Sequence, residues 1–326
     1  MTTPWTELLK DIPANTVDFS QTTALIPLPA LAVLTLTGPE SIKFLQGQAT
    51  TDFRDVEKGL VRRGAICSLK GRVLFSFIAI PDGENVVLVL PADQLDAAYA
   101  HLKKFAIFSK TTLADARSTL AVLGVAGTEA ASAVTTWAGS APDSESASHS
   151  DDGVLTIRIA EESRFLLVVP AAKLAAQWQQ NSLPVAAESH WWAAEIRAGF
   201  ATIFAATRDL FQPQELNYHA IAAVSYNKGC YTGQEVVARL YFRGKLKQRL
   251  YSLQASLGKI PESTEIFAED KHVGDIVMSA VNNGVLNILA IIKNAVAREQ
   301  ALTLADKSTA LTVLALPYAL PAEKEE

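Results

Sequence analysis

The alternation of strand-like and helix-like apolar patterns constrains the fold of this chain more than any other feature. Residues 30–37 read ALAVLTLT, which is typical of a strand, and Gly38 with Pro39 ends this run. Glu40–Gln48 then carries its apolar residues on one side of a helix. The alternation continues to residue 200, with expected strands at Val61–Leu69, Val73–Ile80, Asn85–Leu90, Leu120–Val125, Val154–Ile159 and Arg164–Val169 and expected helices at Asp93–Phe105, Thr128–Trp137, Ala171–Gln180 and Glu188–Phe200.

Turn signals separate several of these elements. Lys70-Gly71-Arg72 joins two expected strands, and Asp82-Gly83 is a strong hairpin signal. Residues 139–153 read GSAPDSESASHSDDG, which predicts a polar loop.

The last third of the chain has a different pattern. Residues 205–220 read as a loop, and Val236–Tyr241 fits a helix or a strand equally well. From Lys247 onward, turns separate short strands, which is typical of a small β-barrel. The patterns together predict an α+β protein with ferredoxin-like α+β layers and a C-terminal small β-barrel. The expected barrel strands are Arg249–Ala255, Val273–Ala280, Val285–Ile292, Ala301–Thr303 and Thr312–Ala315.

The composition limits the class of protein. The chain has 326 residues, a length that favours two or three globular domains and also fits one large domain. Its content of 49% apolar and 19% charged residues excludes a mainly disordered chain. Its net charge of −5 argues against a protein that coats nucleic acid through overall positive charge. Cys67 and Cys230 are its two cysteines, which excludes a disulfide-stapled scaffold and a self-ligated iron–sulfur cluster. The five histidines show no metal-ligand spacing, so no metal site is expected.

The N-terminal residues MTTPWTELLKDIP carry acidic groups early and lack an apolar core, so we expect no signal peptide. No run of eighteen apolar residues occurs, so we expect neither a membrane span nor a membrane partner. The expected location is therefore the cytoplasm.

The most informative segment is the octapeptide Lys228-Gly229-Cys230-Tyr231-Thr232-Gly233-Gln234-Glu235. Glycine permits close approach of the backbone at little steric cost. Lys228 and Arg239 flank the cysteine in sequence, and a nearby cation favours thiolate over thiol. Cys230 is therefore a candidate reactive thiol, single metal ligand or redox-sensitive group, and the alternative is a half-buried cysteine in a tight turn. Cys67 lies in an apolar strand pattern and is expected in the core.

This octapeptide resembles the signature of the YgfZ family of folate-binding proteins, which are relatives of the aminomethyltransferase (T-protein) of the glycine cleavage system. The resemblance covers roughly residues 30–250 and the terminal barrel, and Lys70-Gly71-Arg72 looks like the first hairpin of the family. The octapeptide is highly specific, whereas the other matching blocks are individually weak. These blocks are Phe44-Leu45-Gln46-Gly47-Gln48 with Thr51 and Asp52, Arg197-Ala198-Gly199-Phe200, Gln212-Pro213-Gln214-Glu215, Val236-Val237-Ala238-Arg239 and Phe242-Arg243-Gly244.

The resemblance implies a three-domain, T-protein-like arrangement around a central folate site, with folate bound as tetrahydrofolate. It also implies a role in keeping certain iron–sulfur enzymes active, including those that thiolate tRNA, and the family is described as tRNA-modifying. The expected domains are an N-terminal folate-binding α+β domain at residues 1–117 completed by residues 185–243, a second α+β domain at residues 118–184, and a C-terminal β-barrel domain at residues 244–326.

A pterin is flat and polar at its edge, so a folate site needs an aromatic wall, a carboxylate and cations for the glutamate tail. Trp191 matches the family's folate-stacking tryptophan, whereas its neighbour Trp192 points about 100° away around a helix, so one of the two is expected in the core. Glu215 is the candidate for the pterin edge, and Arg239 is a candidate for the tail. The resemblance places Leu31 where some family members have a second tryptophan, so this departure puts the affinity for folate in doubt.

A basic strip is the other candidate binding feature. Residues 228–249 carry six basic side chains and one acidic side chain, Glu235. Such a strip suits a folate polyglutamate tail, RNA phosphates or an acidic partner, and the alternative is an ordinary solvated surface. The six basic residues are Lys228, Arg239, Arg243, Lys245, Lys247 and Arg249.

Three functions follow, in order of preference. The first is a folate-binding accessory protein that supports iron–sulfur enzymes and thereby tRNA thiolation, through Cys230 and Lys228, without a classical catalytic activity of its own. The second is a folate-dependent aminomethyl transferase, which needs an acid or base beside the folate, and Asp52 is the one candidate. The third is direct tRNA binding through the basic strip.

Overall fold

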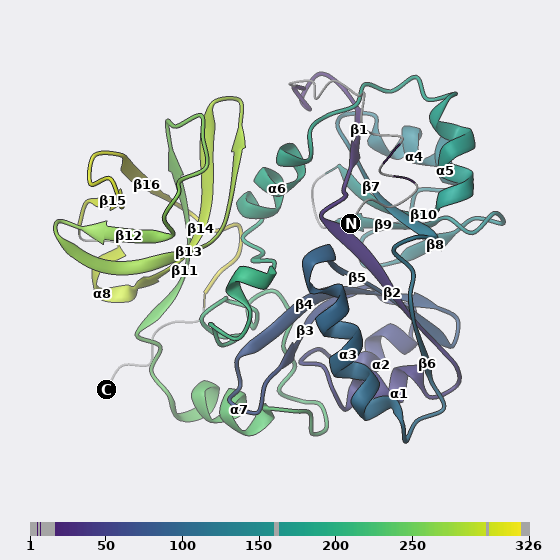
Figure 1. Ribbon diagram of the computed structural model, residues 1–326, viewed down its shortest axis with the longest axis horizontal. Helices are drawn as coiled ribbons and strands as arrows, with labels where there is room; N and C mark the ends of the chain where they lie inside the picture. The colour runs from purple at the N-terminus through teal and green to yellow at the C-terminus, as the bar shows by residue number, and fades with distance from the viewer. Residues whose placement is uncertain (1–4, 6, 8–16, 160–162, 298–299, 321–326) are drawn as a thin grey trace. The chain divides into compact units, whose positions relative to one another are not determined.

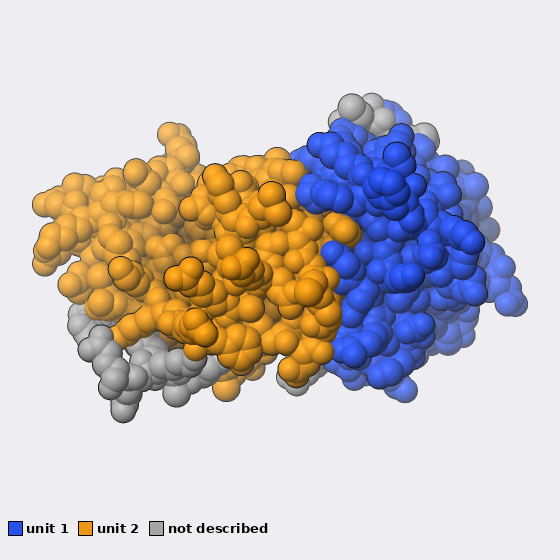
Figure 2. Space-filling model, turned by 90° about the horizontal axis from the view of Figure 1, so that it is seen from below, with its two compact units in different colours: residues 1–47, 52–63, 77–188 blue, residues 48–51, 64–76, 189–326 orange. Residues whose placement is uncertain are grey.

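The computed structural model describes residues 5, 7, 17–159, 163–297 and 300–320 of the chain (Figure 1). Most of the N-terminal segment on which the expectation of no signal peptide depends lies outside these residues. The chain divides into two compact units, coloured in Figure 2. Unit 1 comprises residues 1–47, 52–63 and 77–188, and unit 2 comprises residues 48–51, 64–76 and 189–326. The three-domain boundaries implied by the resemblance stay a prediction.

One sheet has the strand order β3-β4-β5-β2-β6. Its strands are β2 (Leu31–Thr37), β3 (Arg62–Cys67), β4 (Val73–Asp82), β5 (Asn85–Pro91) and β6 (Thr112–Asp115). The hairpin signal Asp82-Gly83 is confirmed, because β4 and β5 pair in antiparallel register up to Asp82 opposite Asn85. The accompanying helices are α1 (Ser41–Gln46), α2 (Phe53–Glu57) and α3 (Leu95–Ala106), which follows a 3₁₀ turn at Ala92–Gln94.

The second sheet, in unit 1, has the order β1-β7-β10-β9-β8. Alternate residues of β7 and β10 pack in one core with α4 and α5, as the two-residue period of a strand requires. This core includes Leu123 and Val125 from β7 and Phe165 and Leu167 from β10. The elements are β1 (Ala24–Pro27), β7 (Leu120–Ala126), α4 (Ala130–Ala138), β8 (Ala147–His149), β9 (Leu155–Ile159), β10 (Arg164–Pro170) and α5 (Ala171–Trp178).

Unit 2 contains the predicted barrel, which is closed in the order β11-β14-β13-β12-β15-β16. Its apolar interior comes from alternate residues, such as Leu253 on β11 and Ile288 and Ala290 on β14. The barrel elements are β11 (Gln248–Ala255), β12 (Glu265–Ala268), β13 (Lys271–Asn282), β14 (Val285–Lys293), α8 (Asn294–Ala297), β15 (Leu302–Leu304) and β16 (Ala310–Leu314).

Apart from residues 48–51 and 64–76, the part of unit 2 that precedes the barrel consists of α6 (Glu188–Arg197), which begins at the boundary of the unit, a long irregular segment and α7 (Gln234–Arg243). The irregular segment has a 3₁₀ turn at Ala205–Thr207 and is held by buried hydrogen bonds. The Tyr218 hydroxyl donates to the Ala201 carbonyl at 2.5 Å, and Asn217 Nδ2 donates to the Leu250 carbonyl at 3.0 Å. The irregular segment between α6 and α7 is therefore a well-packed part of unit 2.

The sequence patterns missed short elements. The residues of β8 lie inside the predicted loop at 139–153, and β1, β6, β12 and α2 were not expected. Each is three to five residues long, too short for a periodic pattern, and is defined by its pairing with a distant strand or by its cap. The open choice for Val236–Tyr241 is settled, because these residues belong to α7. Among the described residues, no helix is both long and apolar enough to cross a membrane.

Candidate functional site

The signature octapeptide lies in unit 2, where a tight turn leads into α7 (Figure 1). Lys228 points inward: its ammonium group is buried and donates to the carbonyl oxygens of Ala49 and Thr51, each at 2.7 Å. The same nitrogen lies 5.2 Å from the centre of the Tyr231 ring. Lys228 therefore anchors the turn to the segment Gln48–Thr51, and its predicted chemical role beside Cys230 stays a prediction.

Thr50 completes this attachment. Its hydroxyl donates to the Ala223 carbonyl at 2.7 Å and accepts a hydrogen bond from the Ala65 amide at 3.0 Å. Its own carbonyl accepts from the Ser225 amide at 2.9 Å. The segment Gln48–Thr51 is thus a clamp beneath the signature turn. Sequence reasoning found the block around it but not this function, because the contacts join residues more than 170 positions apart.

Cys230 is exposed, as is Gly229 before it. The alternative of a half-buried cysteine is therefore wrong. Cys67, in contrast, is buried, as predicted, and burial, with the nearby charge of Asp209 as the smaller cause, raises the pKa of its thiol. Since a thiolate is the reactive form, the structure leaves Cys230 as the accessible sulfur and makes Cys67 inert.

Tyr231 turns back into the protein beside the exposed cysteine. Its side chain is buried, and among the described residues its hydroxyl has no hydrogen-bond partner. Burial raises the pKa of this hydroxyl, so Tyr231 is neutral at physiological pH. In the octapeptide, two buried residues, Lys228 and Tyr231, therefore flank the exposed Gly229 and Cys230.

Gly233 ends the turn in a left-handed conformation, with φ of 81°. A Cβ at this position would lie 2.3 Å from the Ser68 carbonyl oxygen and 3.3 Å from the Cβ of Cys67. Gly71, with φ of 70°, makes the reciprocal approach, because its Cβ would lie 2.9 Å from Val236 on α7. The β3–β4 hairpin and the start of α7 thus pack directly on each other (Figure 1), which requires glycine on both sides.

The remaining signature residues belong to α7 or its start. Thr232 is half-buried, Gln234 is the first residue of the helix, and Glu235 is exposed in the first turn. A carboxylate in that position is favourable at the positive end of a helix.

The residues predicted to hold folate differ in their exposure and in their hydrogen bonds. Trp191 is 2% exposed, so protein atoms cover its indole, whereas Trp192 is half-buried and lies edge-on to Phe204 with ring centres 5.2 Å apart. Both oxygens of the Glu215 carboxylate are bonded, at 2.8 Å to the Gln212 amide and at 2.9 Å to Gln248 Nε2.

The other two predicted folate residues differ from each other in exposure. Leu31 is a buried residue of β2, and Arg239 is exposed on α7. Trp191 and Glu215 therefore do not form a ready-made pterin site in this conformation, and the folate roles of all four residues stay predictions.

The basic strip is shorter than predicted. Lys228 and Arg249 are buried, and Arg249 Nε donates to Asn294 Oδ1 at 3.2 Å. The exposed members are Arg239, Arg243, Lys245 and Lys247. Tyr241 and Phe242 of α7 are exposed as well, although no sequence motif marks them as candidate site residues. The signal for them was two adjacent aromatic residues between two arginines.

Asp52, the candidate base, lies in unit 1 at the N-terminus of α2. Its carboxylate accepts from the Arg54 amide at 3.1 Å, from the Arg54 guanidinium and from Gln46 Nε2 at 3.1 Å. The hydrogen bond from the Arg54 side chain is the largest cause that lowers the pKa of Asp52 to about 2. Asp52 is therefore a helix cap and a weak base.

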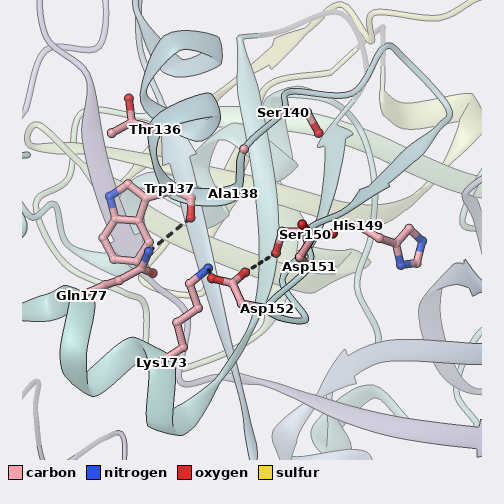
Figure 3. A pocket seen from close by; sticks show the side chains of 11 residues that line it. Thr136, Trp137, Ala138, Ser140, His149, Ser150, Asp151, Asp152, Lys173 and Gln177 are labelled. Atoms are coloured by element: carbon pink, nitrogen blue, oxygen red, sulfur yellow. Dashed lines mark hydrogen bonds and ion pairs between the residues drawn. The ribbon is translucent and has the colours of Figure 1, made fainter.

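A cavity of about 610 Å³ lies elsewhere in unit 1 (Figure 3). Lys173 and Asp152 form an ion pair at its wall, and Ser150 Oγ donates to the same carboxylate at 2.5 Å. None of the predicted site residues lines it. Among the described residues, no cluster of three or more His, Cys, Asp or Glu side chains is arranged to hold a metal ion.

Comparison with solved structures shows a shared fold. The chain matches the glycine cleavage system aminomethyltransferase T from Bartonella henselae with a TM-score of 0.77 and 16% identity, over 97% of each chain. The predicted α+β, T-protein-like fold with a C-terminal barrel is therefore confirmed.

Comparison with curated sequences identifies relatives, although no family model matches the chain. The tRNA-modifying protein YgfZ of Serratia proteamaculans is 34% identical over 92% of this chain and 94% of its own length. Those of Photorhabdus laumondii, at 33% identity, and Sodalis glossinidius, at 32%, are matched over 92% and 91% of this chain and over 94% and 93% of their own lengths. Identity at this level, sustained over nearly the whole length of both chains, means that this protein belongs to the YgfZ family, as its octapeptide predicted.

Proposed function

We propose that this protein is a folate-binding accessory factor of the cytoplasm that supports iron–sulfur enzymes, and thereby the thiolation of tRNA, through the thiol of Cys230. Its relatives are named tRNA-modifying, which supports the tRNA part. The fold shared with an aminomethyltransferase supports the folate part. The thiol part rests on the structure of the octapeptide.

The observation that carries the proposal is the presentation of Cys230. Lys228 holds the turn on one side through two carbonyl oxygens, and Gly233 holds it on the other against the β3–β4 hairpin. Between these anchors Cys230 is exposed. A rigidly held, accessible thiol is suited to meeting a partner or a small molecule, since little conformational freedom is lost when it does.

Tetrahydrofolate, when bound, supplies one-carbon or reducing chemistry. Trp191 is covered by protein atoms and both oxygens of Glu215 are already hydrogen-bonded, so neither residue faces a bound pterin in this conformation. The chain's own contribution is to present the Cys230 thiol and to keep the Tyr231 hydroxyl neutral and buried beside it.

Anaerobic calorimetric titration with tetrahydrofolate tests the folate part. We expect saturable binding in the parent protein and weaker binding in Trp191→Phe. Trp192→Phe is the matched control, because the Trp192 indole packs against Phe204. This variant should bind tetrahydrofolate as the parent protein does. An absence of binding in the parent protein would remove folate from the proposal.

Complementation tests the thiol part. A strain lacking its own family member is given the parent gene or Cys230→Ala, and thiolated tRNA is measured. We expect the variant to fail although it folds, with an unchanged melting temperature, because its side chain is exposed. Full restoration by Cys230→Ala would show that the thiol is not required.

An aminomethyl transferase is the second candidate. It needs a group that accepts a proton near the folate, and Asp52 is held by Arg54 with a pKa of about 2. A carboxylate with this pKa is a poor base at neutral pH, so the structure favours the accessory role. Formation of methylene-tetrahydrofolate from a protein-bound aminomethyl donor would reverse this preference.

A further inference from the structure

The exposed surface of α7 carries two aromatic rings as well as cations. Phe242 is 60% exposed and Tyr241 is 39% exposed. Arg239 precedes Phe242 by three positions and Arg243 by four, so these three side chains share one face of the helix. Tyr241 lies about 100° away from Phe242, towards the side of the buried Val237. We call the exposed residues Arg239, Tyr241, Phe242 and Arg243 of α7, together with Lys247 four positions beyond the helix, the α7 platform.

The rings of the α7 platform are held in place from beneath. Tyr241 stacks on Tyr226, with ring centres 3.7 Å apart and planes inclined by 15°. Phe242 stands edge-on to Tyr241 at 5.0 Å and 83°. The Tyr226 hydroxyl accepts from Gln214 Nε2 at 3.2 Å, which fixes the supporting ring. Rings that are already immobilised lose little side-chain entropy when a ligand stacks on them.

The charge of the α7 platform is opposite to that of the whole chain. The protein has a net charge of −5, yet α7 and the residues up to Lys247 carry four basic side chains and one acidic side chain, Glu235. Arg239, Arg243 and Lys247 are exposed, and in the described part of the chain none of them forms an ion pair. These cations are available to an anionic ligand.

The tip of the β3–β4 hairpin, beside the first turn of α7, is also basic. Gly71 packs against Val236 at the start of α7, so the exposed side chains of the hairpin tip lie beside the helix. They are Leu69, which is 82% exposed, and the cations Lys70 and Arg72. Exposed positive charge is therefore present on the hairpin tip as well as on α7.

We propose that the α7 platform binds a single-stranded segment of RNA. Bases stack on Phe242 and Tyr241, and phosphates contact Arg239, Arg243 and Lys247. Exposed aromatic faces combined with cations are the usual device for unpaired nucleotides, because the bases of a duplex are stacked on each other and cannot stack on protein. An acidic polypeptide would satisfy the cations but would leave the rings without a partner. This function goes beyond folate binding and does not depend on it.

Fluorescence anisotropy with a labelled twelve-nucleotide RNA tests the proposal, without folate. We expect the single strand to bind at least tenfold more tightly than the same sequence as a duplex. With three phosphate contacts, the slope of log K against log salt should be about −2. Equal affinity for the duplex would overturn the proposal.

Phe242→Ala should weaken single-strand binding by between about 5-fold and 150-fold, the range expected for one stacked base. Phe108→Ala is the matched control, because Phe108 is 90% exposed and also lies near lysines, but in unit 1. Loss of binding in the control, or none in Phe242→Ala, would contradict the assignment. Binding of polyglutamate with higher affinity than RNA would contradict it as well.

Arg243→Gln is a second variant, and it leaves the aromatic rings of the α7 platform unchanged. It should reduce the steepness of the salt dependence by about 0.7 for one lost phosphate contact. An unchanged slope would place the phosphates elsewhere. Both variants should bind tetrahydrofolate as the parent does, so failure of the RNA proposal and failure of the folate proposal are distinguishable.

Discussion

Gly233 and Ser68 are in such close contact that a side chain at position 233 would lie 2.3 Å from the Ser68 carbonyl oxygen. The contact joins the signature turn to a hairpin that is 165 residues earlier in the chain. The second glycine of the octapeptide is therefore explained by packing as well as by its positive φ. The oxygen belongs to the backbone, so it cannot move aside as a flexible side chain would.

Gly233→Ala should lower the free energy of unfolding by more than about 2 kcal/mol, because it combines an unfavourable φ with a steric clash. Gly284→Ala is the control: its φ is 75° but nothing lies within 4 Å of the added Cβ, so it should cost about 1 kcal/mol. Urea denaturation of both variants measures the difference. Equal losses would mean that the hairpin contact contributes nothing.

Lys228→Met should destabilise the protein by about 2 to 3 kcal/mol, because it leaves the carbonyl oxygens of Ala49 and Thr51 buried without their donor. Lys247→Met, at an exposed position, should change the free energy of unfolding by less than about 0.5 kcal/mol. Chemical denaturation gives both values. A Lys228→Met variant as stable as the parent would show that the ammonium group is not an anchor.

The two thiols should react at very different rates with an aromatic disulfide reagent at pH 8. One thiol per chain, Cys230, is expected to react at once, because it is exposed. Cys67 should react upon unfolding, since it is buried and its pKa is raised. Cys230→Ser should abolish the fast phase. A fast phase that persists in this variant would contradict the burial of Cys67.

Asp52→Asn should lose about 1 kcal/mol of stability at pH 7, because Asn keeps the helix cap but cannot pair with Arg54. The pKa of Asp52 is lowered to about 2, so the charged carboxylate stabilises the fold above pH 4. This contribution is lost as the pH falls towards 2. The difference between variant and parent should therefore vanish over that interval in urea titrations.

Glu57→Gln provides the control for this pH dependence. Glu57 is exposed on the same helix, so its replacement should change stability by less than about 0.5 kcal/mol. A difference between Asp52→Asn and the parent that stays constant from pH 5 to pH 2 would show that the Arg54 pair does not lower the pKa.

Much of the fold was predictable because its main signals are local. Val285–Ile292 was predicted as a strand from its apolar run alone and is β14, and the turn at Asp82-Gly83 announces its own hairpin. The exposure of Cys230 was not determined by such a pattern. The glycines around it permit a tight turn but do not say which side chain points inward.

The orientation of Lys228 and the closeness of Gly233 to Ser68 depend on contacts between segments more than 150 residues apart. No periodicity within either segment carries that information. The aromatic residues of the α7 platform were missed for a related reason: whether Val236–Tyr241 is a helix or a strand decides which of its side chains share a face. Once α7 is known to be a helix, Arg239 and Phe242 come together.

Unit 2 is assembled from three separate stretches of the chain, and this has a consequence for synthesis. Residues 48–51 and 64–76 leave the ribosome well before residue 189, which lies 113 positions beyond residue 76. At a synthesis rate of about 5 to 20 residues per second, residue 189 is added roughly 6 to 23 seconds after residue 76. During this time the rest of unit 2 has not been made, so it does not cover the clamp and the hairpin. We therefore expect apolar residues of these two segments to stay exposed on the nascent polypeptide during this interval.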